Sequence, residues 1–255
     1  MITGHTACVV PLCSQEVSCD DSPFWCPDSL DQYHCGDGIQ PIASAYAPSA
    51  CWASRQGRQH PLLPQPTGRY CYQARLLGTA KVEIVCLVQT SASLSEAAYD
   101  ATTTSLMTAG AGVPSLTSAQ AIGQALQALG ARRIALVSPY SQDVLDRARQ
   151  YFESRYGLEV VAMEGFGATD SYAISTISAD HATASFTRVD RPEIEALVVP
   201  GGNFPTLCSI AAWEQQFHKP VVTTNQAALW AMMGVMQMST PLPGLGWLLE
   251  HLPGV

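Results

Sequence analysis

The 255-residue chain is 47% hydrophobic and only 13% charged, which fits a compact globular protein of one domain or two small ones. Its formal charge of −8, from 13 Lys and Arg against 21 Asp and Glu, leaves no basic surface of the kind that a nucleic-acid backbone requires. No apolar stretch approaches the roughly 20 residues that span a bilayer, and the opening MITGH resembles no secretion signal, so we expect a cytoplasmic protein with neither membrane nor nucleic acid as a partner.

The cysteines are unevenly spread, with seven of the nine in the first 71 residues. Only Cys8 and Cys13 have a C-x2-4-C spacing, so the two such pairs of a zinc site are missing. The odd total and the missing secretion signal argue against a disulfide framework. We therefore predict reduced thiols that pack as small apolar side chains, and no bound metal.

The first third of the chain opens with an apolar run at 6–12, which predicts a buried strand. Residues 13–67 are irregular and rich in Pro, Ser, Cys and Gln, so they specify little regular structure. A helix at 70–79 and a second buried strand at 81–88 follow, and that strand ends in the polar turn 89–93.

Helices and strands alternate through the remainder of the chain. A helix leads to 113–117, and Ser118 is expected to cap a helix over 119–129 that Gly130 closes. The further expected elements are a strand at 133–138, a helix at 143–156, a strand at 158–163, a helix end at 192–196 and a strand at 197–199. Strands that alternate with helices of this length predict a parallel sheet.

An internal repeat indicates that the chain has two similar halves. VPSLTSAQA at 113–121 is echoed by KPVVTTNQA at 219–227. Two further pairs of segments match in the same way: 83–91 with 195–203, and 8–12 with 135–140. We predict two pseudosymmetric α/β halves, each with a parallel four-stranded sheet. The predicted division assigns 1–112 with 230–255 to one half and 113–229 to the other.

Three pairs of loops follow the carboxyl ends of these strands, where open parallel sheets bind ligands. The pairs are 11–15 with 139–142, 89–93 with 201–203, and 117–118 with 223–224. Their hydroxyls, amides and backbone N–H groups suit a carboxylate or an enolate oxygen, with Thr90, Ser91 and Ser93 as side-chain donors. In the alternative interpretation, Thr90 and Ser91 merely cap the next helix.

Two other kinds of site gain little support. The Gly201-Gly202 pair lacks both the third spaced glycine and the later acidic residue of a dinucleotide loop. None of the six histidines lies in a paired loop, so a Ser-His-Asp triad is not indicated.

Residues 70–235 resemble the aspartate/glutamate racemase superfamily, in particular its maleate cis-trans isomerase and arylmalonate decarboxylase branch. The segments that carry the resemblance are QTSAS at 89–93, ALGARRIAL at 128–136 with PY at 139–140, GGNFPTL at 201–207 and KPVVTTNQAALW at 219–230. The resemblance implies a two-half fold, an active site in the cleft between the halves and catalysis without a cofactor.

The departures from this pattern bear on the chemistry. Racemases and isomerases of the superfamily place one catalytic cysteine on each half, at positions that correspond here to Gln89 and Gly201. Neither an amide nor a glycine exchanges a proton near neutral pH, so thiol-dependent racemisation and isomerisation are disfavoured. The decarboxylase surrounds one carboxylate with a Thr-Ser pair and a Tyr, which correspond to Thr90, Ser91 and Tyr140.

Our first functional hypothesis is a lyase that stabilises the enolate of a small carboxylate or β-keto acid, most readily a decarboxylase. The resemblance implies that the decarboxylase takes its proton from a cysteine at the position of Gly201. Cys13 is the hypothesised replacement, because it lies in the loop after the first strand, whose counterpart in the family borders the active site. The residues expected to bind substrate are Pro11, Gln89, Gly201, Gly202, Asn203 and Thr224. There are two alternatives: a thiol-independent isomerase or cyclase, and a carboxylate-binding protein without turnover. The expected partner is a small carboxylate substrate, and a homo-oligomer is left open.

Overall fold

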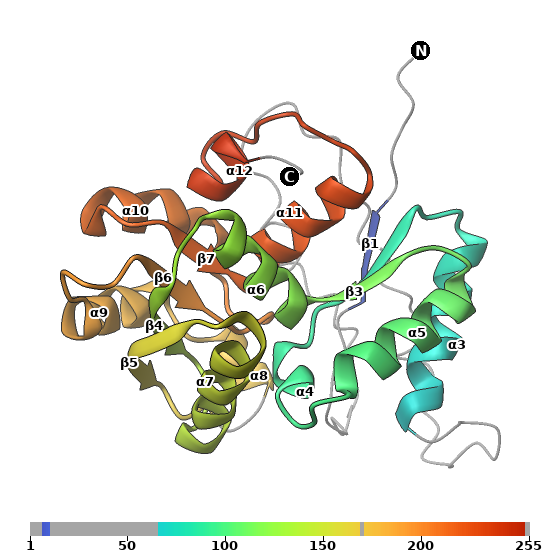
Figure 1. Ribbon diagram of the computed structural model, residues 1–255, viewed down its shortest axis with the longest axis horizontal. Helices are drawn as coiled ribbons and strands as arrows, with labels where there is room; N and C mark the ends of the chain where they lie inside the picture. Colours follow the sequence, from blue (N-terminus) through green and yellow to red (C-terminus); the bar gives the residue numbers. More distant parts are fainter. Residues whose placement is uncertain (1–6, 11–65, 169–170, 253–255) are drawn as a thin grey trace, which may run out of the picture.

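The computed structural model describes residues 7–10, 66–168 and 171–252. The expected site residues Pro11 and Cys13 lie outside the described residues. Two parallel β-sheets form the framework, and helices cover them (Figure 1). None of the helices in the described ranges is long and apolar enough to cross a membrane.

The first sheet has three strands within the described part of the chain, in the spatial order β1-β2-β3. They are β1 (Ala7–Val10), β2 (Ile84–Leu87) and β3 (Ser115–Thr117), all parallel. All four residues of β2 are buried, which explains its continuous apolar sequence IVCL. Helices α3 (Pro66–Thr79) and α5 (Tyr99–Ala111) pack against each other beside it, and Met107 joins Val85 and Leu87 in a small core.

The second sheet has the order β5-β4-β6-β7 and is also parallel. Its strands are β4 (Arg133–Ser138), β5 (Glu159–Gly165), β6 (Ala196–Val199) and β7 (Val221–Thr223). The elements associated with this half are α7 (Gln142–Tyr156), α8 (Ser171–Ser175), α9 (Ala179–Val189), η1 (Leu207–Ser209), α10 (Ile210–Phe217) and α12 (Trp247–His251). The predicted two-half α/β fold with parallel sheets is thereby confirmed.

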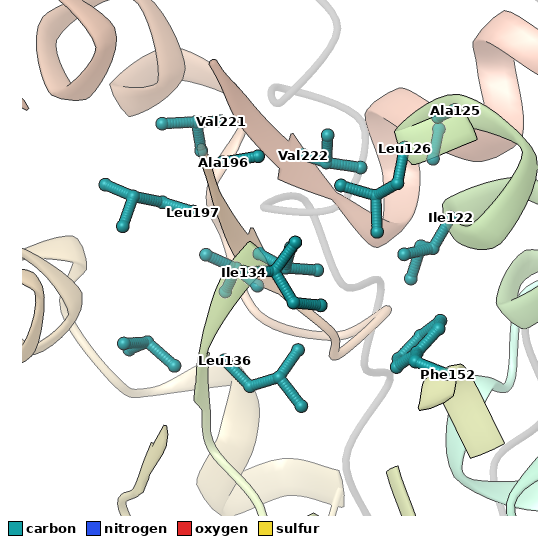
Figure 2. Packing of buried hydrophobic residues seen from close by; sticks show 14 of the residues in the cluster. Ile122, Ala125, Leu126, Ile134, Leu136, Phe152, Ala196, Leu197, Val221 and Val222 are labelled. Carbon is teal, nitrogen blue, oxygen red and sulfur yellow. The ribbon is translucent and has the colours of Figure 1, made fainter. Parts of the chain in front are cut away.

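Two helices join the halves, α6 (Ser118–Ala128) and α11 (Thr224–Val235), which pack against each other between the sheets in Figure 1. Helix α6 follows a strand of the first sheet, yet its apolar face lies in the core of the second half. Figure 2 shows Ile122 and Leu126 of α6 on the same side as Val222 and Phe152 of that core. Helix α11 follows a strand of the second sheet but also packs against Ile84 and Cys86 of β2. Each half therefore contributes a helix to the packing of the other.

The repeated segments adopt the same local structure, as the sequence echo predicts. Thr117 caps α6 and Thr223 caps α11, each in a capping box with the glutamine three residues on, Gln120 and Gln226. The cap of α6 is Thr117 and not Ser118, which is the first helical residue. Gly130 ends α6 as expected, with a φ of 70° that suits glycine.

Some boundaries differ from the sequence prediction. The first sheet shows three described strands where four were expected. Strand β3 pairs with β2, so residues 115–117 lie in the first sheet, whereas the predicted division assigns them to the second half. Leu245, Leu248 and Leu249, expected in the first half, pack in the core of the second. Helix α9 ends at Val189, so no helix end lies at 192–196.

Candidate active site

Thr90 lies at the centre of a cluster of hydroxyl groups from both halves. It is the first residue of α4 (Thr90–Ser93), just beyond the carboxyl end of β2, and only 1% of it is exposed. Its Oγ1 lies 2.9 Å from Ser118 Oγ and 3.1 Å from Thr224 Oγ1. The loops after β2, β3 and β7 thus converge, as the repeat predicts.

The capping alternative for this turn is not supported. The N-cap of α4 is Gln89, whose side chain makes no capping hydrogen bond. The hydrogen bonds described for Thr90 join it to other side chains and not to the backbone of its own helix. The hydroxyl of Thr90 therefore serves the cluster.

The loop after β6 reaches the cluster through its backbone. The Gly201 N–H donates a hydrogen bond to Thr224 Oγ1 over 2.8 Å, and Asn225 Nδ2 donates to the Gly202 carbonyl over 3.1 Å. Because Thr224 Oγ1 accepts from this amide, its own proton is free to point at Thr90 Oγ1, the neighbouring acceptor. The amide of Gly201 is thereby linked to the Thr90 hydroxyl through Thr224.

Both glycines of this loop are required by close contacts. Gly201 has a φ of 149°, and a Cβ there would lie 2.9 Å from Pro139 Cγ. A Cβ on Gly202 would lie 2.8 Å from the Val88 carbonyl oxygen, which belongs to the other half. The backbone of the second half therefore approaches the first at a distance that a side chain would prevent.

Tyr140 completes the donor set from the loop after β4. It is 8% exposed, and burial raises the pKa of its hydroxyl to about 12, although hydrogen bonds with Thr90 and Ser91 offset part of the rise. Ser138 Oγ accepts from the Tyr140 N–H over 3.3 Å and donates to the Pro200 carbonyl over 2.8 Å. Ser138 thus ties the loop that carries Tyr140 to the loop that carries Gly201.

The polar groups of this cluster are neutral hydroxyls and amides. Such donors stabilise an anionic oxygen without needing a counter-charge, and they are worth more in a buried site than in water. Ser93, on the same short helix, is 1% exposed and its hydroxyl has no hydrogen-bond partner within the described structure. Across the described ranges, no group of three or more His, Cys, Asp or Glu side chains is placed to hold a metal ion.

The structure brings together most of the residues that the sequence singles out. Thr90, Ser91, Tyr140, Thr224 and the Gly201 backbone are linked by hydrogen bonds. Gln89 and Gly202 adjoin them and are partly buried, whereas Asn203 is largely exposed.

Sequence reasoning missed two members of the cluster. The sequence places Ser118 in one of the paired ligand-binding loops, but assigns it as a helix cap and not as a site residue. Ser138, the last residue of β4, is fully buried and accepts a hydrogen bond from the Tyr140 backbone N–H. Thr224, expected to contact substrate, has its hydroxyl engaged with Gly201 and Thr90.

The chain is similar in sequence to known proteins. A family model described as arylmalonate decarboxylase matches residues 67–249. The maleate isomerase of Nocardia farcinica is 27% identical over 135 residues, which cover 52% of this chain and 53% of that protein. The arylmalonate decarboxylase of Bordetella bronchiseptica is 28% identical over 162 residues, which cover 62% and 66% of the two chains. The chain thus matches about half the length of its maleate isomerase relatives.

A solved structure extends the likeness to the fold. A cysteine-to-alanine variant of the maleate isomerase Iso from Pseudomonas putida S16, determined with maleate, superimposes with a TM-score of 0.70 at 25% identity. The superposition covers 74% of this chain and 78% of the isomerase. The two sheets and the helices around them therefore follow the plan of these enzymes, which is the aspartate/glutamate racemase-like fold.

Proposed function

The chain belongs to the arylmalonate decarboxylase family, and from this premise we propose that it is a cofactor-independent enzyme that stabilises the enolate of a small carboxylate, with decarboxylation as its reaction. The observation that carries the proposal is the hydrogen-bonded cluster of Thr90, Ser118 and Thr224 beside Tyr140. It gathers neutral donors from both halves around a single position.

The proposed reaction needs no more than these donors and a proton. When a malonate-type substrate loses CO2, the electron pair of the broken C–C bond moves into the remaining carboxyl group and forms an enediolate. Thr90, Ser91 and Tyr140 donate hydrogen bonds to its oxygen atoms, where the negative charge develops. A proton delivered to the carbanionic carbon then gives the monocarboxylate product.

Tyr140 is suited to donate rather than to act as a base. With a pKa raised to about 12, its hydroxyl keeps its proton throughout the physiological pH range. A protonated phenol can donate to a carboxylate and strengthen that bond as the enediolate forms. The hydrogen bond from its backbone N–H to the Ser138 hydroxyl holds the loop that carries it, which limits reorganisation during the reaction.

The buried thiol of Cys86 offers no replacement for a proton donor at Gly201. Cys86 in β2 is fully buried against α11, and desolvation raises the pKa of its thiol. It therefore packs as a small apolar side chain and is a poor nucleophile. The proton donor is assigned to Cys13, as a hypothesis that rests on its place after the first strand.

A thiol-independent isomerase is the second candidate, favoured by the similarity to maleate isomerases in sequence and in fold. In that case the same donors would polarise a carboxyl group while the substrate rearranges. The two reactions differ in stoichiometry, because decarboxylation releases CO2 and isomerisation leaves the mass of the substrate unchanged.

Mass spectrometry of incubations with arylmalonates, β-keto acids and maleate tests the proposal. A product lighter than its substrate by the mass of CO2 supports decarboxylation. Conversion of maleate at constant mass supports the isomerase. Binding of these acids without any conversion would refute both and leave a carboxylate-binding protein.

A further inference from the structure

Asp100 is a fully buried carboxylate in α5 that the proposed reaction does not use. Its Oδ1 accepts a hydrogen bond from Thr117 Oγ1 over 2.9 Å, and its Oδ2 accepts one from the Tyr151 hydroxyl over 2.5 Å. The Arg155 guanidinium lies 3.8 Å from Oδ2. A buried carboxylate is costly unless it is paired, so its full set of partners calls for an explanation.

The partners of Asp100 come from both halves of the molecule. Asp100 lies on α5, whereas Tyr151 and Arg155 lie on α7 beside the second sheet. Thr117 lies between them, at the junction of β3 and α6. The carboxylate therefore fixes the side chain of Thr117 where the two halves meet.

Thr117 directly precedes a member of the hydroxyl cluster. Its Oγ1 accepts from the Gln120 N–H over 3.3 Å and donates its proton to Asp100. The next residue, Ser118, presents its hydroxyl 2.9 Å from Thr90 Oγ1. The place of Ser118 consequently depends on how Thr117 is held.

The other copy of the repeat shows that capping alone does not need a carboxylate. Thr223 forms the same capping box with Gln226, but in the described structure no carboxylate is hydrogen-bonded to its hydroxyl. The capping glutamine of this copy, Gln226, donates from Nε2 to the Leu245 carbonyl over 2.8 Å. The capping of α6 therefore does not by itself explain why Asp100 is hydrogen-bonded to Thr117.

We propose that Asp100 is a positioning residue for the anion site: by holding Thr117 between the two halves, it sets the place of the Ser118 hydroxyl and so the orientation of Thr90. The inference rests on the proposed function, in which Thr90 meets the substrate. Because Tyr151 and Arg155 of α7 contact the Asp100 carboxylate, the position of the Ser118 hydroxyl also depends on how α7 packs against the first half.

Crystal structures of the Asp100→Asn and Tyr151→Phe variants test the inference without reference to activity. An amide offers one oxygen where the carboxylate offers two, so one of the two hydroxyl donors loses its acceptor. We expect the Oγ–Oγ distance between Thr90 and Ser118 to lengthen beyond about 3.5 Å. The bond between the Gly201 N–H and Thr224, in the second half, should stay at 2.8 Å. An unchanged Thr90–Ser118 pair in both variants would overturn the inference.

Kinetics with the substrate that the mass spectrometry identifies provide the second test. We expect Asp100→Asn to lower kcat about tenfold with KM changed less than about twofold, because a misplaced donor acts on the transition state. In a Ser118→Ala background the same change should cost less than about twofold, since both substitutions act through one hydroxyl. If the losses of kcat from Asp100→Asn and Ser118→Ala multiply in the double variant, Asp100 does not act through Ser118.

A matched control separates positioning from general stability. Ser178→Ala removes the side-chain cap of α9, which lies outside the cluster, and should lower the melting temperature without altering kcat. If Asp100→Asn does not fold, the same kinetic measurements are made on Tyr151→Phe, alone and in the Ser118→Ala background. If the wild-type protein converts no carboxylate, the proposed function fails, and the crystal structures alone decide whether Asp100 positions Ser118.

Discussion

The hydroxyl oxygens of Thr90 and Thr224, 134 positions apart in the sequence, lie 3.1 Å from each other. One residue begins a helix after a strand of the first sheet, and the other begins a helix after a strand of the second. A donor of one half is therefore oriented by a residue of the other. The site can form only when both halves are folded and docked.

The first prediction concerns the central hydroxyl. Thr90→Ala should lower kcat/KM by about 100-fold, because one preorganised donor to the developing oxyanion is lost. Thr90→Ser, which keeps the hydroxyl, should retain most of the activity. As a control, Thr79→Ala removes an exposed hydroxyl that bonds only to its own helix in the described structure, and should leave turnover unchanged. Equal losses for the alanine and serine variants would argue against a donor role.

The second prediction is the pH dependence set by Tyr140. Its raised pKa of about 12 means that deprotonation, and with it the loss of a donor, begins only above about pH 11. Titration of Tyr140 should therefore cause no fall in the kcat of the wild-type enzyme below about pH 11. Tyr140→Phe should lower kcat about 10- to 100-fold at every pH from 6 to 10. A wild-type loss near pH 10 that the phenylalanine variant lacks would contradict the assignment.

The third prediction tests the loop after β6. Gly201→Ala should destabilise the protein by about 1 to 3 kcal/mol and also reduce activity, because the new Cβ meets Pro139 and shifts the amide that bonds Thr224. Gly157→Ala is the matched control, with a φ of 63° but no atom near the added Cβ. It should cost about 1 kcal/mol from backbone strain and leave kcat intact. Thermal denaturation and steady-state kinetics measure both effects.

The fourth prediction separates orientation from substrate contact at Thr224. Thr224→Val keeps the shape of the side chain but removes the oxygen that links Gly201 to Thr90. We expect kcat to fall about tenfold with little change in KM, and Thr224→Ser to restore it. A large rise in KM with unchanged kcat would instead show that Thr224 binds the substrate directly.

The fifth prediction addresses the proton donor. If Cys13 protonates the enediolate, Cys13→Ala should abolish product formation while binding of the carboxylate persists. Calorimetric titration with an arylmalonate measures the binding, and CO2 release measures the reaction. Turnover at the wild-type rate would remove Cys13 from the mechanism.

The repeat and the strands were predictable because they depend on local patterns. The buried apolar runs of β2, β4 and β6 are written in neighbouring residues, and they locate the loops that carry Thr90, Tyr140 and Gly201. The packing of α6 and α11 against the opposite halves was not predictable. Periodicity shows that α6 has an apolar face, but not which sheet that face covers. The same reason conceals Asp100, whose partners on β3 and α7 come together only in the tertiary structure.

The most direct test of the central claim is a crystal structure with a bound arylmalonate or a non-reactive analogue. Our account predicts one carboxylate oxygen at about 3 Å from both Thr90 Oγ1 and the Tyr140 hydroxyl, with the Ser91 side chain beside it. A ligand whose carboxylates contact none of these three groups would contradict it.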